Sequence, residues 1–395
     1  MRGRLLVAAI LAPALILRLG LAVLHDPPPL TGDAQAFAAH AASIADHGAY
    51  PQSPIAPGGG PTAFRPPAYP SLLAAVYEVA GRDEAPRIAG ALIGTLAVAL
   101  LGLVALRLFD RRVALIAMAI AAVFPPLVMV SVATLSEGLF IALVLGALAC
   151  ALEARRDPGR LAWVLAAGAL AGAAGLTRTN GLVILVSLLL AIPRRRLVLL
   201  AAALVVLAPW TIRNLNEFDT FVPTTTQAGF TLAGAYNDEA RTDDRFPSAW
   251  RPPTMPPYSE ILRRHRGEDE AELERRFRAE AVDYAADHPL HPPRVVFWAT
   301  VRMLNLADPQ LEELSAREAG VGNGFVRLNR YATWALLALA AAGAVAARPP
   351  PWLWLFPLLL WLSVAIAIGA TRYRVPVDPF LILLAATALA RWRRA

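Results

Sequence analysis

The chain has 395 residues, of which 57% are hydrophobic and only 17% are charged, and its mean hydropathy is +0.49. Soluble domains carry roughly a quarter of charged residues, so this composition excludes an ordinary soluble domain and predicts an all-α polytopic membrane protein. The net charge is +7 and every basic residue is arginine, but the arginines cluster between hydrophobic segments, where membrane topology explains them without a nucleic-acid partner.

Ten apolar stretches are candidates to cross a lipid bilayer. In chain order they lie at about 5–24, 87–106, 113–130, 137–153, 161–176, 180–193, 197–212, 331–347, 352–370 and 376–390. If these segments alternate in direction, the arginine clusters fall on one side, which the positive-inside rule identifies as the cytoplasm. The sequence therefore predicts a multi-pass protein of the inner (plasma) membrane with both termini in the cytoplasm.

The predicted spans divide the chain into three regions. These are an N-terminal transmembrane region at 1–212 with a first outer loop at 25–86, a large outer (periplasmic or extracellular) loop at 213–330, and C-terminal transmembrane helices at 331–395. Two further apolar stretches, Ala68–Ala80 and Val295–Leu306, are too short to span, and we expect them to lie as helices on the membrane surface. The second outer loop also contains a predicted soluble helix at Glu268–Asp287, followed by Pro289.

The first outer loop carries an acid, Asp33, at the head of a predicted amphipathic helix, Ala34–His47, which Gly48 ends. Aspartate is a favoured N-cap residue, so a purely structural capping role explains its position. An acid at the outer membrane face can also take a proton from a hydroxyl, as a general base does. Local chemistry alone leaves both interpretations open.

A second acid, Glu137, opens the predicted span at 137–153. Thr134, three residues earlier, completes a capping-box pattern, which would make this glutamate structural. The alternative is a second catalytic carboxylate that faces the same outer cavity as Asp33. The pattern itself does not decide between the two roles.

Four arginines are candidates for a phosphate site. Arg178, Arg372 and Arg374 lie in short outer loops, against the positive-inside bias. Arg65 lies in the first outer loop, directly before two prolines. Guanidinium groups bind phosphate through paired hydrogen bonds, whereas snorkelling towards lipid headgroups is the structural alternative for each of the four.

Four other residues are candidate site members: Glu84, Tyr69, Tyr373 and His265. Glu84 lies in a charge-balanced segment that also fits a solvated turn, and His265 lies among arginines, where a histidine is usually only exposed. The single cysteine, Cys150, excludes a disulfide framework and a multi-cysteine metal site. No HExxH, P-loop, GxSxG or dinucleotide-binding motif occurs in the sequence.

The order of these motifs resembles that of bacterial membrane glycosyltransferases of the GT-C superfamily. The likeness is to family 39 enzymes, which are dolichyl-phosphate-mannose protein mannosyltransferase-like, and to aminoarabinose transferase-like enzymes. It covers nearly the whole chain and rests on Asp33 after the first apolar helix and then on Arg65–Pro70, Glu84–Arg87, Leu135–Phe140, Leu176–Arg178, Pro209–Asn214 and Arg372–Pro376. The resemblance implies a GT-C bundle of about ten transmembrane helices with two outer loops that carry surface-lying helices.

The resemblance also implies roles for particular residues. A polyprenyl-phosphate sugar is the implied donor, and the acid of the first outer loop, Asp33, is the implied general base. Glu137 matches an acidic position that borders the cavity, and Arg65 matches a basic position suited to phosphate. Phe64 stands where the lipid A-modifying relatives carry glutamate. We therefore assign no metal and no cofactor, and a divalent metal remains an open alternative.

The sequence thus predicts a membrane glycosyltransferase that moves a hexosyl or pentosyl group from a polyprenyl-phosphate donor to an acceptor on the outer face, with inversion of the anomeric centre. A protein, a glycan and a lipid are all open as the acceptor. Two other classes remain: a transporter or flippase that moves a lipid-linked sugar without chemistry, and a membrane acyltransferase or ligase. Sugar transfer from a labelled lipid donor separates all three.

Overall fold

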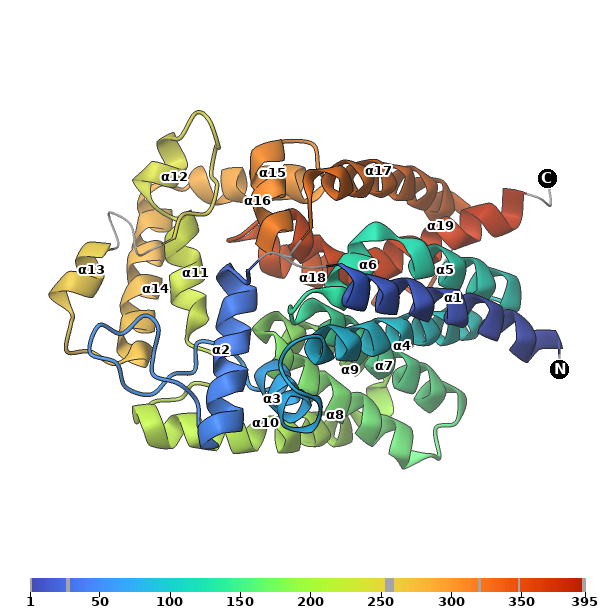
Figure 1. Cartoon of the computed structure of the whole chain (residues 1–395), viewed down its shortest axis with the longest axis horizontal. Helices are drawn as coiled ribbons and strands as arrows, with labels where there is room; N and C mark the ends of the chain where they lie inside the picture. Colours follow the sequence, from blue (N-terminus) through green and yellow to red (C-terminus); the bar gives the residue numbers. More distant parts are fainter. Residues whose placement is uncertain (1, 26–28, 253–258, 319–320, 347–348, 393–395) are drawn as a thin grey trace.

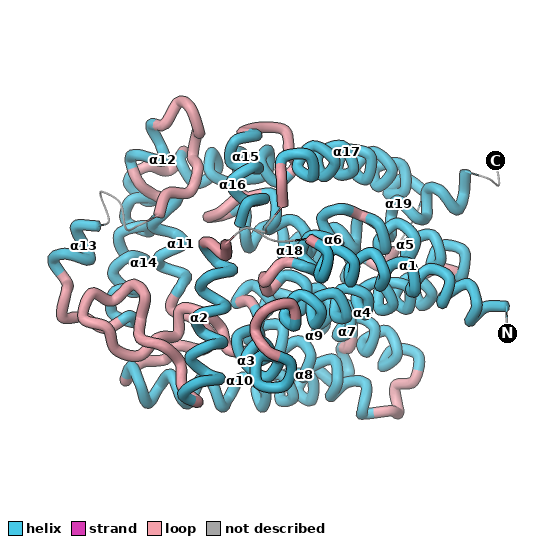
Figure 2. The backbone as a smooth tube through the Cα atoms, viewed as in Figure 1, coloured by secondary structure: helices cyan, strands magenta, loops and turns pink. Residues whose placement is uncertain are grey.

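The structure is a computed structural model that describes residues 2–25, 29–252, 259–318, 321–346 and 349–392. Within these ranges the chain forms nineteen α-helices and three short 3₁₀ helices joined by loops, with no β-strand (Figures 1 and 2). The predicted all-α class is confirmed.

Eleven helices form an apolar bundle. They are α1 (Arg2–Leu24), α4 (Ala85–Leu108), α5 (Arg111–Val123), α6 (Pro125–Val132), α7 (Glu137–Arg156), α8 (Leu161–Thr177), α9 (Ile184–Ala191), α10 (Arg196–Phe218), α17 (Asn323–Ala346), α18 (Pro351–Ala365) and α19 (Asp378–Trp392). The 3₁₀ helices are η1 (Thr179–Val183), η2 (Pro193–Arg195) and η3 (Thr371–Val377).

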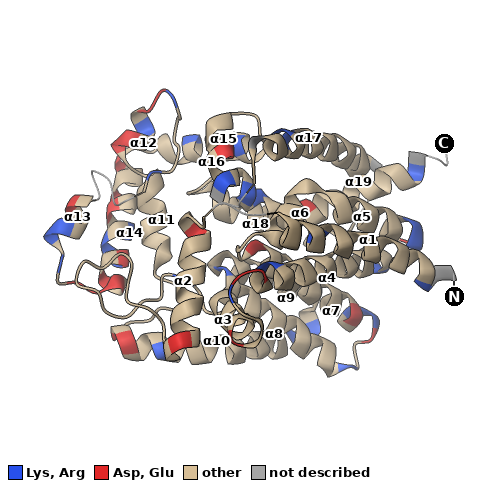
Figure 3. Ribbon diagram, in the orientation of Figure 1, with Lys and Arg blue, Asp and Glu red and all other residues tan. Residues whose placement is uncertain are grey.

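Eight helices come from the two predicted outer regions. They are α2 (Gly32–His47), α3 (Ala68–Ala80), α11 (Gln227–Ala235), α12 (Asp238–Thr242), α13 (Ser259–Arg264), α14 (Glu270–Asp287), α15 (His291–Met303) and α16 (Pro309–Glu318). Charged residues gather on α12, α13 and α14 at one end of the molecule, whereas the bundle helices carry few along most of their length (Figure 3). The first turn of α1 and the last turn of α19 both lie at the opposite end (Figure 1).

Five helical segments of the described chain have the length and composition to cross a membrane: α1, α4, α7, η2–α10 and η3–α19. The third predicted span, 113–130, is wrong as one straight helix, because α5 and α6 meet at an angle of 58°. Counted as one span, this pair raises the number to six. Three other apolar segments, α8, η1–α9 and α18, are shorter.

The bend between α5 and α6 follows from two consecutive prolines, Pro125 and Pro126. Proline has no backbone N–H, so the carbonyls four residues earlier, those of Ala121 and Ala122, lose their helical donors. Arg18 of α1 replaces them, because its guanidinium donates to Ala121 O at 3.2 Å and to Ala122 O at 2.8 Å. The Arg18 side chain is fully buried, so α1 supplies a charge inside the bundle that satisfies the broken helix.

Small residues let helices of the bundle approach one another closely. Gly168 and Gly172, four residues apart on α8, face the backbone carbonyls of Leu199 and Ala203 on α10. A side chain at either glycine would collide with those carbonyls, so this small-xxx-small stripe sets the α8–α10 distance. The helix pairs α4–α7, α7–α8 and α17–α19 also pack along their lengths, and together they enclose the main apolar core.

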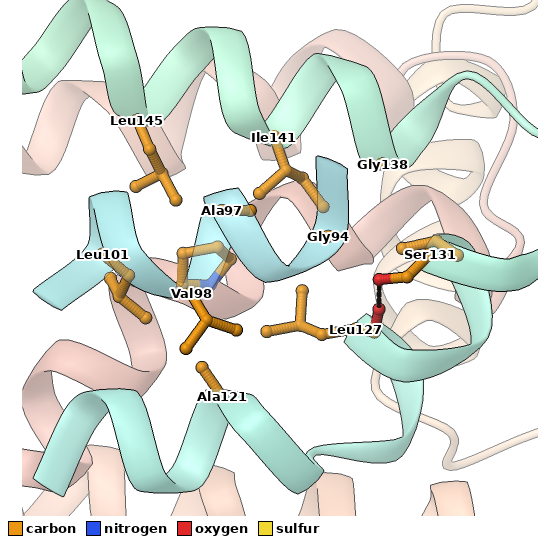
Figure 4. Close-up of a pocket in the computed structure, with 12 residues that line it drawn as sticks. Gly94, Ala97, Val98, Leu101, Ala121, Leu127, Ser131, Gly138, Ile141 and Leu145 are labelled. Atoms are coloured by element: carbon orange, nitrogen blue, oxygen red, sulfur yellow. Dashed lines mark hydrogen bonds between the residues drawn. The ribbon is translucent and has the colours of Figure 1, made fainter. Parts of the chain in front are cut away.

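A gap inside the bundle shows how tightly this core is filled. It has a volume of about 10 Å³ and lies between α4, α5, α6 and α7, where Val98, Leu127 and Ile141 point towards one another (Figure 4). Such a volume holds about one water molecule. The bundle therefore has no ligand-sized space here.

The two outer regions are joined by Glu270 at the start of α14. Its buried carboxylate accepts hydrogen bonds from Ser53 Oγ at 2.5 Å, Thr62 Oγ1 at 2.8 Å and Ala63 N at 2.8 Å, and also from Thr226 Oγ1. Four donors on one buried carboxylate make a satisfied polar link. This link ties the first outer loop to the second and positions the segment that leads into α3.

Candidate functional site

A cavity of about 590 Å³ lies between the outer regions and the bundle. Its walls come from α2, the segments around Pro54 and Arg65, α11 with Trp250, α16, and the turn Ile368–Tyr373. Parts of the chain more than 300 residues apart therefore meet in one space that is large enough for a small ligand.

Asp33 lies on the wall of this cavity, one residue into α2. The alternative role as the N-cap is wrong, because the capping residue is Thr31. The Asp33 carboxylate instead binds two arginines. One oxygen, Oδ1, lies 2.5 Å from Arg65 Nη2, and the other, Oδ2, binds Arg372 Nη2. An acid from the first outer loop is thus linked to the last outer turn of the chain.

Arg65 is held in place by aromatic rings. Its guanidinium carbon lies 5.0 Å from the ring centroid of Phe37 and 5.2 Å from that of Phe64, and its backbone carbonyl accepts from Tyr50 Oη at 3.3 Å. Cation–π contacts of this kind hold a guanidinium without neutralising its charge. Phe64 therefore contacts the arginine directly. It stands at the position where the resemblance to the lipid A-modifying relatives would place a glutamate.

Arg372 and Tyr373 come from η3 and face the same acid. Arg372 is almost fully buried, and its Nη2 donates to Tyr373 Oη at 2.8 Å. Tyr373 Oη in turn lies 3.4 Å from Asp33 Oδ2. The Arg372 guanidinium also lies 4.8 Å from the centroid of the Tyr373 ring.

Glu137 and Arg178 form a layer behind Tyr373, outside the cavity lining. Arg178 Nη1 lies 2.9 Å from Glu137 Oε1, and it donates to Ser136 Oγ at 3.1 Å. The capping-box interpretation of Glu137 is wrong, because Ser136 is the N-cap of α7 and no side chain caps it. Glu137 reaches the cavity residues only through Arg372, whose Nε lies 3.9 Å away.

Arg374 lies two residues beyond Arg372 but points into the core. It is fully buried, and its Nε lies 2.8 Å from Asp378 Oδ1. It also donates to Met303 O at 2.7 Å and to Thr333 Oγ1 at 2.9 Å. The structure therefore separates Arg374 from the cavity that Arg65 and Arg372 line.

Three other candidates also lie away from the cavity. Tyr69 is buried against Phe37, with ring centroids 5.1 Å apart, and burial raises the pKa of its hydroxyl above the usual range. Glu84 is exposed at the start of α4, beside a surface groove. His265 lies in the outer region, where its Nδ1 is 2.9 Å from Glu268 Oε1.

His40 is a cavity residue that the sequence reasoning missed. It follows Asp33 and Ala36 at helical spacing on the face of α2 that lines the cavity, and this spacing was the available signal. Burial, with a smaller contribution from the charge of Arg65, lowers the pKa of His40 to about 4, although its contact with Ala36 O at 2.7 Å acts in the opposite direction. The imidazole is therefore neutral at pH 7.

The other wall of the cavity carries acids that are already engaged. Asp308 Oδ2 lies 2.5 Å from Arg302 Nε, and Glu312 Oε2 lies 2.8 Å from Arg330 Nη2. Across the described residues, no group of three or more His, Cys, Asp or Glu side chains is close enough to hold a metal ion. With two arginines on Asp33 and a phenylalanine beside Arg65, the donor set here does not fit a divalent ion, and we derive no step through one.

Comparisons with known proteins agree with this architecture. Residues 64–212 match the family described as dolichyl-phosphate-mannose-protein mannosyltransferase. This match runs from the residue before Arg65 into α10 and includes Glu137 and Arg178. No curated protein matches the chain by sequence.

Solved structures extend the likeness to nearly the whole chain. The Archaeoglobus fulgidus oligosaccharyltransferase in complex with zinc and sulfate superposes with a TM-score of 0.58 at 15% identity, over 98% of this chain and 49% of that one. AglB from the same organism, in complex with an inhibitory peptide and a dolichol-phosphate, gives a TM-score of 0.56 at 15% identity, over 98% and 51%. The chain thus spans about half the length of these proteins.

A third structure is ArnT from Cupriavidus metallidurans bound to undecaprenyl phosphate. It matches 98% of this chain and 77% of its own at 17% identity, and its TM-score of 0.45 is too low to add to the fold assignment. The family match and the oligosaccharyltransferase structures confirm the predicted GT-C resemblance and the polytopic GT-C fold.

Proposed function

From the GT-C fold and the family match over residues 64–212, we propose that this chain is a membrane glycosyltransferase that takes a sugar from a polyprenyl-phosphate donor. The observation that carries the proposal is the Asp33 cluster. A carboxylate that can accept a proton lies in a cavity between two guanidinium groups that can bind a phosphate, Arg65 and Arg372.

The proposed donor competes with Asp33 for its arginines. A sugar linked to a polyprenyl phosphate is a phosphodiester that carries one negative charge, and guanidinium groups bind such a group through paired hydrogen bonds. When the phosphate of the sugar donor accepts hydrogen bonds from the N–H groups of Arg65 and Arg372, fewer of those groups bind Asp33. Its carboxylate is then available to an acceptor hydroxyl or amine.

The chemical step is a single displacement. The acceptor oxygen or nitrogen forms a bond to the anomeric carbon while its proton moves to an Asp33 oxygen. The bond from the anomeric carbon to the phosphate oxygen breaks, and its electrons remain on the departing polyprenyl phosphate. Arg65 and Arg372 stabilise the charge that grows there, and Arg178 adds to the positive field from behind Tyr373.

This arrangement favours inversion of the anomeric centre. A retaining mechanism needs a second carboxylate to act as a nucleophile. Asp308 and Glu312 line the cavity, but Arg302 and Arg330 already bind them. Asp33 differs from them because its partners, Arg65 and Arg372, are the groups proposed to bind the donor phosphate. Phosphate binding would therefore free the Asp33 carboxylate.

The cavity lies on the side of the molecule away from the two chain ends. The arginine pattern predicts that both termini lie in the cytoplasm, and on this basis we propose that the reaction takes place on the outer face of the membrane. The donor would then meet its acceptor outside the cytoplasm. The acceptor is a protein, a glycan or a lipid that presents a hydroxyl or an amine.

Purified Asp33→Asn protein tests the proposal against labelled polyprenyl-phosphate sugars. Loss of a general base predicts a fall in transfer rate of about 10²- to 10⁴-fold, with an unchanged melting temperature. Asp46→Asn is a matched control, because Asp46 lies on the same helix and binds Arg82 at the surface. Near-wild-type transfer by a stable Asp33→Asn variant would refute the role of Asp33. Movement of lipid-linked sugar across vesicles without transfer would instead indicate a transporter.

A further inference from the structure

Glu137 is a fully buried acid that does not reach the cavity. Its two nearest cationic groups are Arg178, at 2.9 Å, and Arg372, at 3.9 Å. Neither of its oxygens has a geometrically aligned hydrogen-bond donor. A buried carboxylate without a hydrogen-bond donor is stabilised by nearby cations, and it stabilises the two guanidinium groups in the same way.

Tyr373 explains why a counter-charge is needed at this point. Its ring centroid lies 5.3 Å from the guanidinium carbon of Arg178 and 4.8 Å from that of Arg372. Two like charges against one ring repel each other, and an anion close to both offsets that repulsion. Glu137 lies within 4.0 Å of both guanidinium groups, so it supports the orientation in which Arg372 faces Asp33.

The charges of the cluster can be counted. It contains three guanidinium groups and two carboxylates: Arg65, Arg178, Arg372, Asp33 and Glu137. Three positive and two negative charges give a formal charge of +1. A donor phosphodiester contributes one negative charge, so the occupied site is neutral before the reaction.

The reaction preserves this balance. When Asp33 takes the acceptor proton, the formal charge of the protein cluster becomes +2. The polyprenyl phosphate that departs is a phosphate monoester, whose charge approaches −2 at neutral pH. The two changes cancel, so the occupied site has the same formal charge before and after the reaction. With Glu137 counted as a carboxylate that charge is zero, and without its negative charge it would be +1 in both states.

We propose that Glu137 sets the charge of the phosphate site so that the polyprenyl phosphate product is stabilised yet can dissociate. This inference rests on the proposed donor class. Glu137 is a positioning residue in this scheme: it touches neither substrate nor reacting atoms and acts through Arg372 and Arg178. Without its negative charge the site retains the product phosphate too strongly.

Direct binding of a polyprenyl monophosphate to the purified full chain tests this role without requiring turnover. Glu137→Gln keeps the size of the side chain and removes only its charge. We expect the variant to bind polyprenyl monophosphate about tenfold more tightly, while its affinity for the uncharged polyprenol is unchanged. In transfer assays, kcat should fall, and added polyprenyl monophosphate should inhibit at about tenfold lower concentration.

Two further variants separate charge from structure. Glu137→Gln combined with Arg178→Gln returns the formal charge to +1, so its affinity for polyprenyl monophosphate should return to within about threefold of wild type. Glu153→Gln is the matched control, because Glu153 lies on the same helix and pairs with Arg107 away from the cavity. It should leave affinity unchanged.

The outcomes discriminate between the two proposals. Unchanged affinity in a stable Glu137→Gln variant, or equal tightening for the uncharged polyprenol, would overturn the charge-setting role alone. If Glu137→Gln does not fold, Arg178→Gln must bind the monophosphate about tenfold more weakly, and wild-type affinity there would overturn it as well. A wild-type protein that binds no polyprenyl monophosphate would overturn the donor class and this inference together.

Discussion

Arg372 and Arg374 are two residues apart on one 3₁₀ turn, and each binds an aspartate, yet they belong to different parts of the molecule. Arg372 binds Asp33 across a cavity wall, and its partners come from an outer loop. Arg374 binds Asp378 inside the bundle and is surrounded by further acceptors. The same pair of residue types therefore serves a site in one place and the fold in the other.

The difference between the two pairs lies in what surrounds them. The Arg374 pair is completely buried, and its guanidinium is fully used by fixed protein groups. The Asp33 carboxylate lines the open cavity and remains 20% exposed. An ion pair that a ligand can reach can be exchanged for an ion pair with that ligand, whereas a sealed pair can only be broken. The following variants test this distinction.

The largest effect is expected when the sealed pair is broken. Asp378→Asn leaves the Arg374 charge buried without its counter-charge, which should cost about 3–5 kcal/mol of stability. Thermal unfolding in detergent measures the loss. Asp46→Asn, which breaks an exposed pair with Arg82, should change stability by less than about 0.5 kcal/mol. Equal melting temperatures for these two variants would contradict the distinction.

Arg372→Gln should damage catalysis more than stability. It removes a charged donor from the proposed phosphate site, and we expect kcat/KM for the donor to fall about 100-fold. Its melting temperature should fall less than that of Asp378→Asn. Arg82→Gln, at an exposed pair on the outer surface, should retain full activity. A variant of Arg372 that is unstable but active would reverse the assignment.

His40 makes the stability of the cavity wall depend on pH. Its pKa is lowered to about 4 in the folded chain, against about 6.5 in an unfolded one, because burial disfavours the imidazolium. Between these values only the unfolded state takes up the proton, so this contribution is complete above pH 6.5 and is lost as the pH falls towards 4. The loss should be about 3 kcal/mol by pH 4.

Melting temperatures measured from pH 7 to pH 4.5 check this prediction. His40→Gln should flatten the pH dependence, whereas His47→Gln, at an exposed position on the same helix, should leave it unchanged. An identical pH dependence in wild type and His40→Gln would show that other groups are responsible.

Tyr373→Phe should give the smallest effect. The hydroxyl accepts from Arg372 at 2.8 Å but lies 3.4 Å from Asp33, at the outer limit of a hydrogen bond. Its removal should slow sugar transfer by about threefold, which corresponds to one weak hydrogen bond. The aromatic ring remains to separate Arg178 from Arg372, so donor affinity should be close to that of wild type. Tyr331→Phe, at an exposed position, controls for a general loss of tyrosine hydroxyls.

Much of the architecture follows from sequence patterns. The surface helix at Ala68–Ala80 has the bounds expected of it, and the soluble helix predicted at Glu268–Asp287 begins two residues later, at Glu270. Hydropathy located the bundle helices because lipid requires long apolar segments with internal hydrogen bonds. It did not reveal the bend at Pro125, because a window average ignores which backbone carbonyls lose their donors.

The site was less accessible to sequence reasoning. Asp33 was predicted from its place at the head of a helix in the first outer loop, Arg65 from its place before two prolines, and Arg372 from its place against the positive-inside bias. Their contact depends on packing between the two ends of the chain. The opposite directions of Arg372 and Arg374 had a signal, because residues two apart on a helical turn lie on different faces. The sequence analysis predicted a loop at Arg372–Arg374, and a loop has no fixed faces, so this signal could not be used. Capping patterns also misled, since both Asp33 and Glu137 bind arginines instead.

Arg18 has a consequence for how the chain is made. An arginine in a spanning helix opposes insertion, by up to about 2.5–3.5 kcal/mol at the helix centre, and Arg18 lies between the centre and the Leu24 end of the span Arg4–Leu24. The carbonyls that satisfy it belong to Ala121 and Ala122, which are synthesised about a hundred residues later. When the first helix is made, the acceptor available to Arg18 is the carbonyl of Ala14, one turn earlier on the same helix and 3.1 Å away, and the two acceptors on α5 are still to be synthesised. The hydrogen bonds of Arg18 are therefore completed only when α5 packs against α1 during assembly of the bundle.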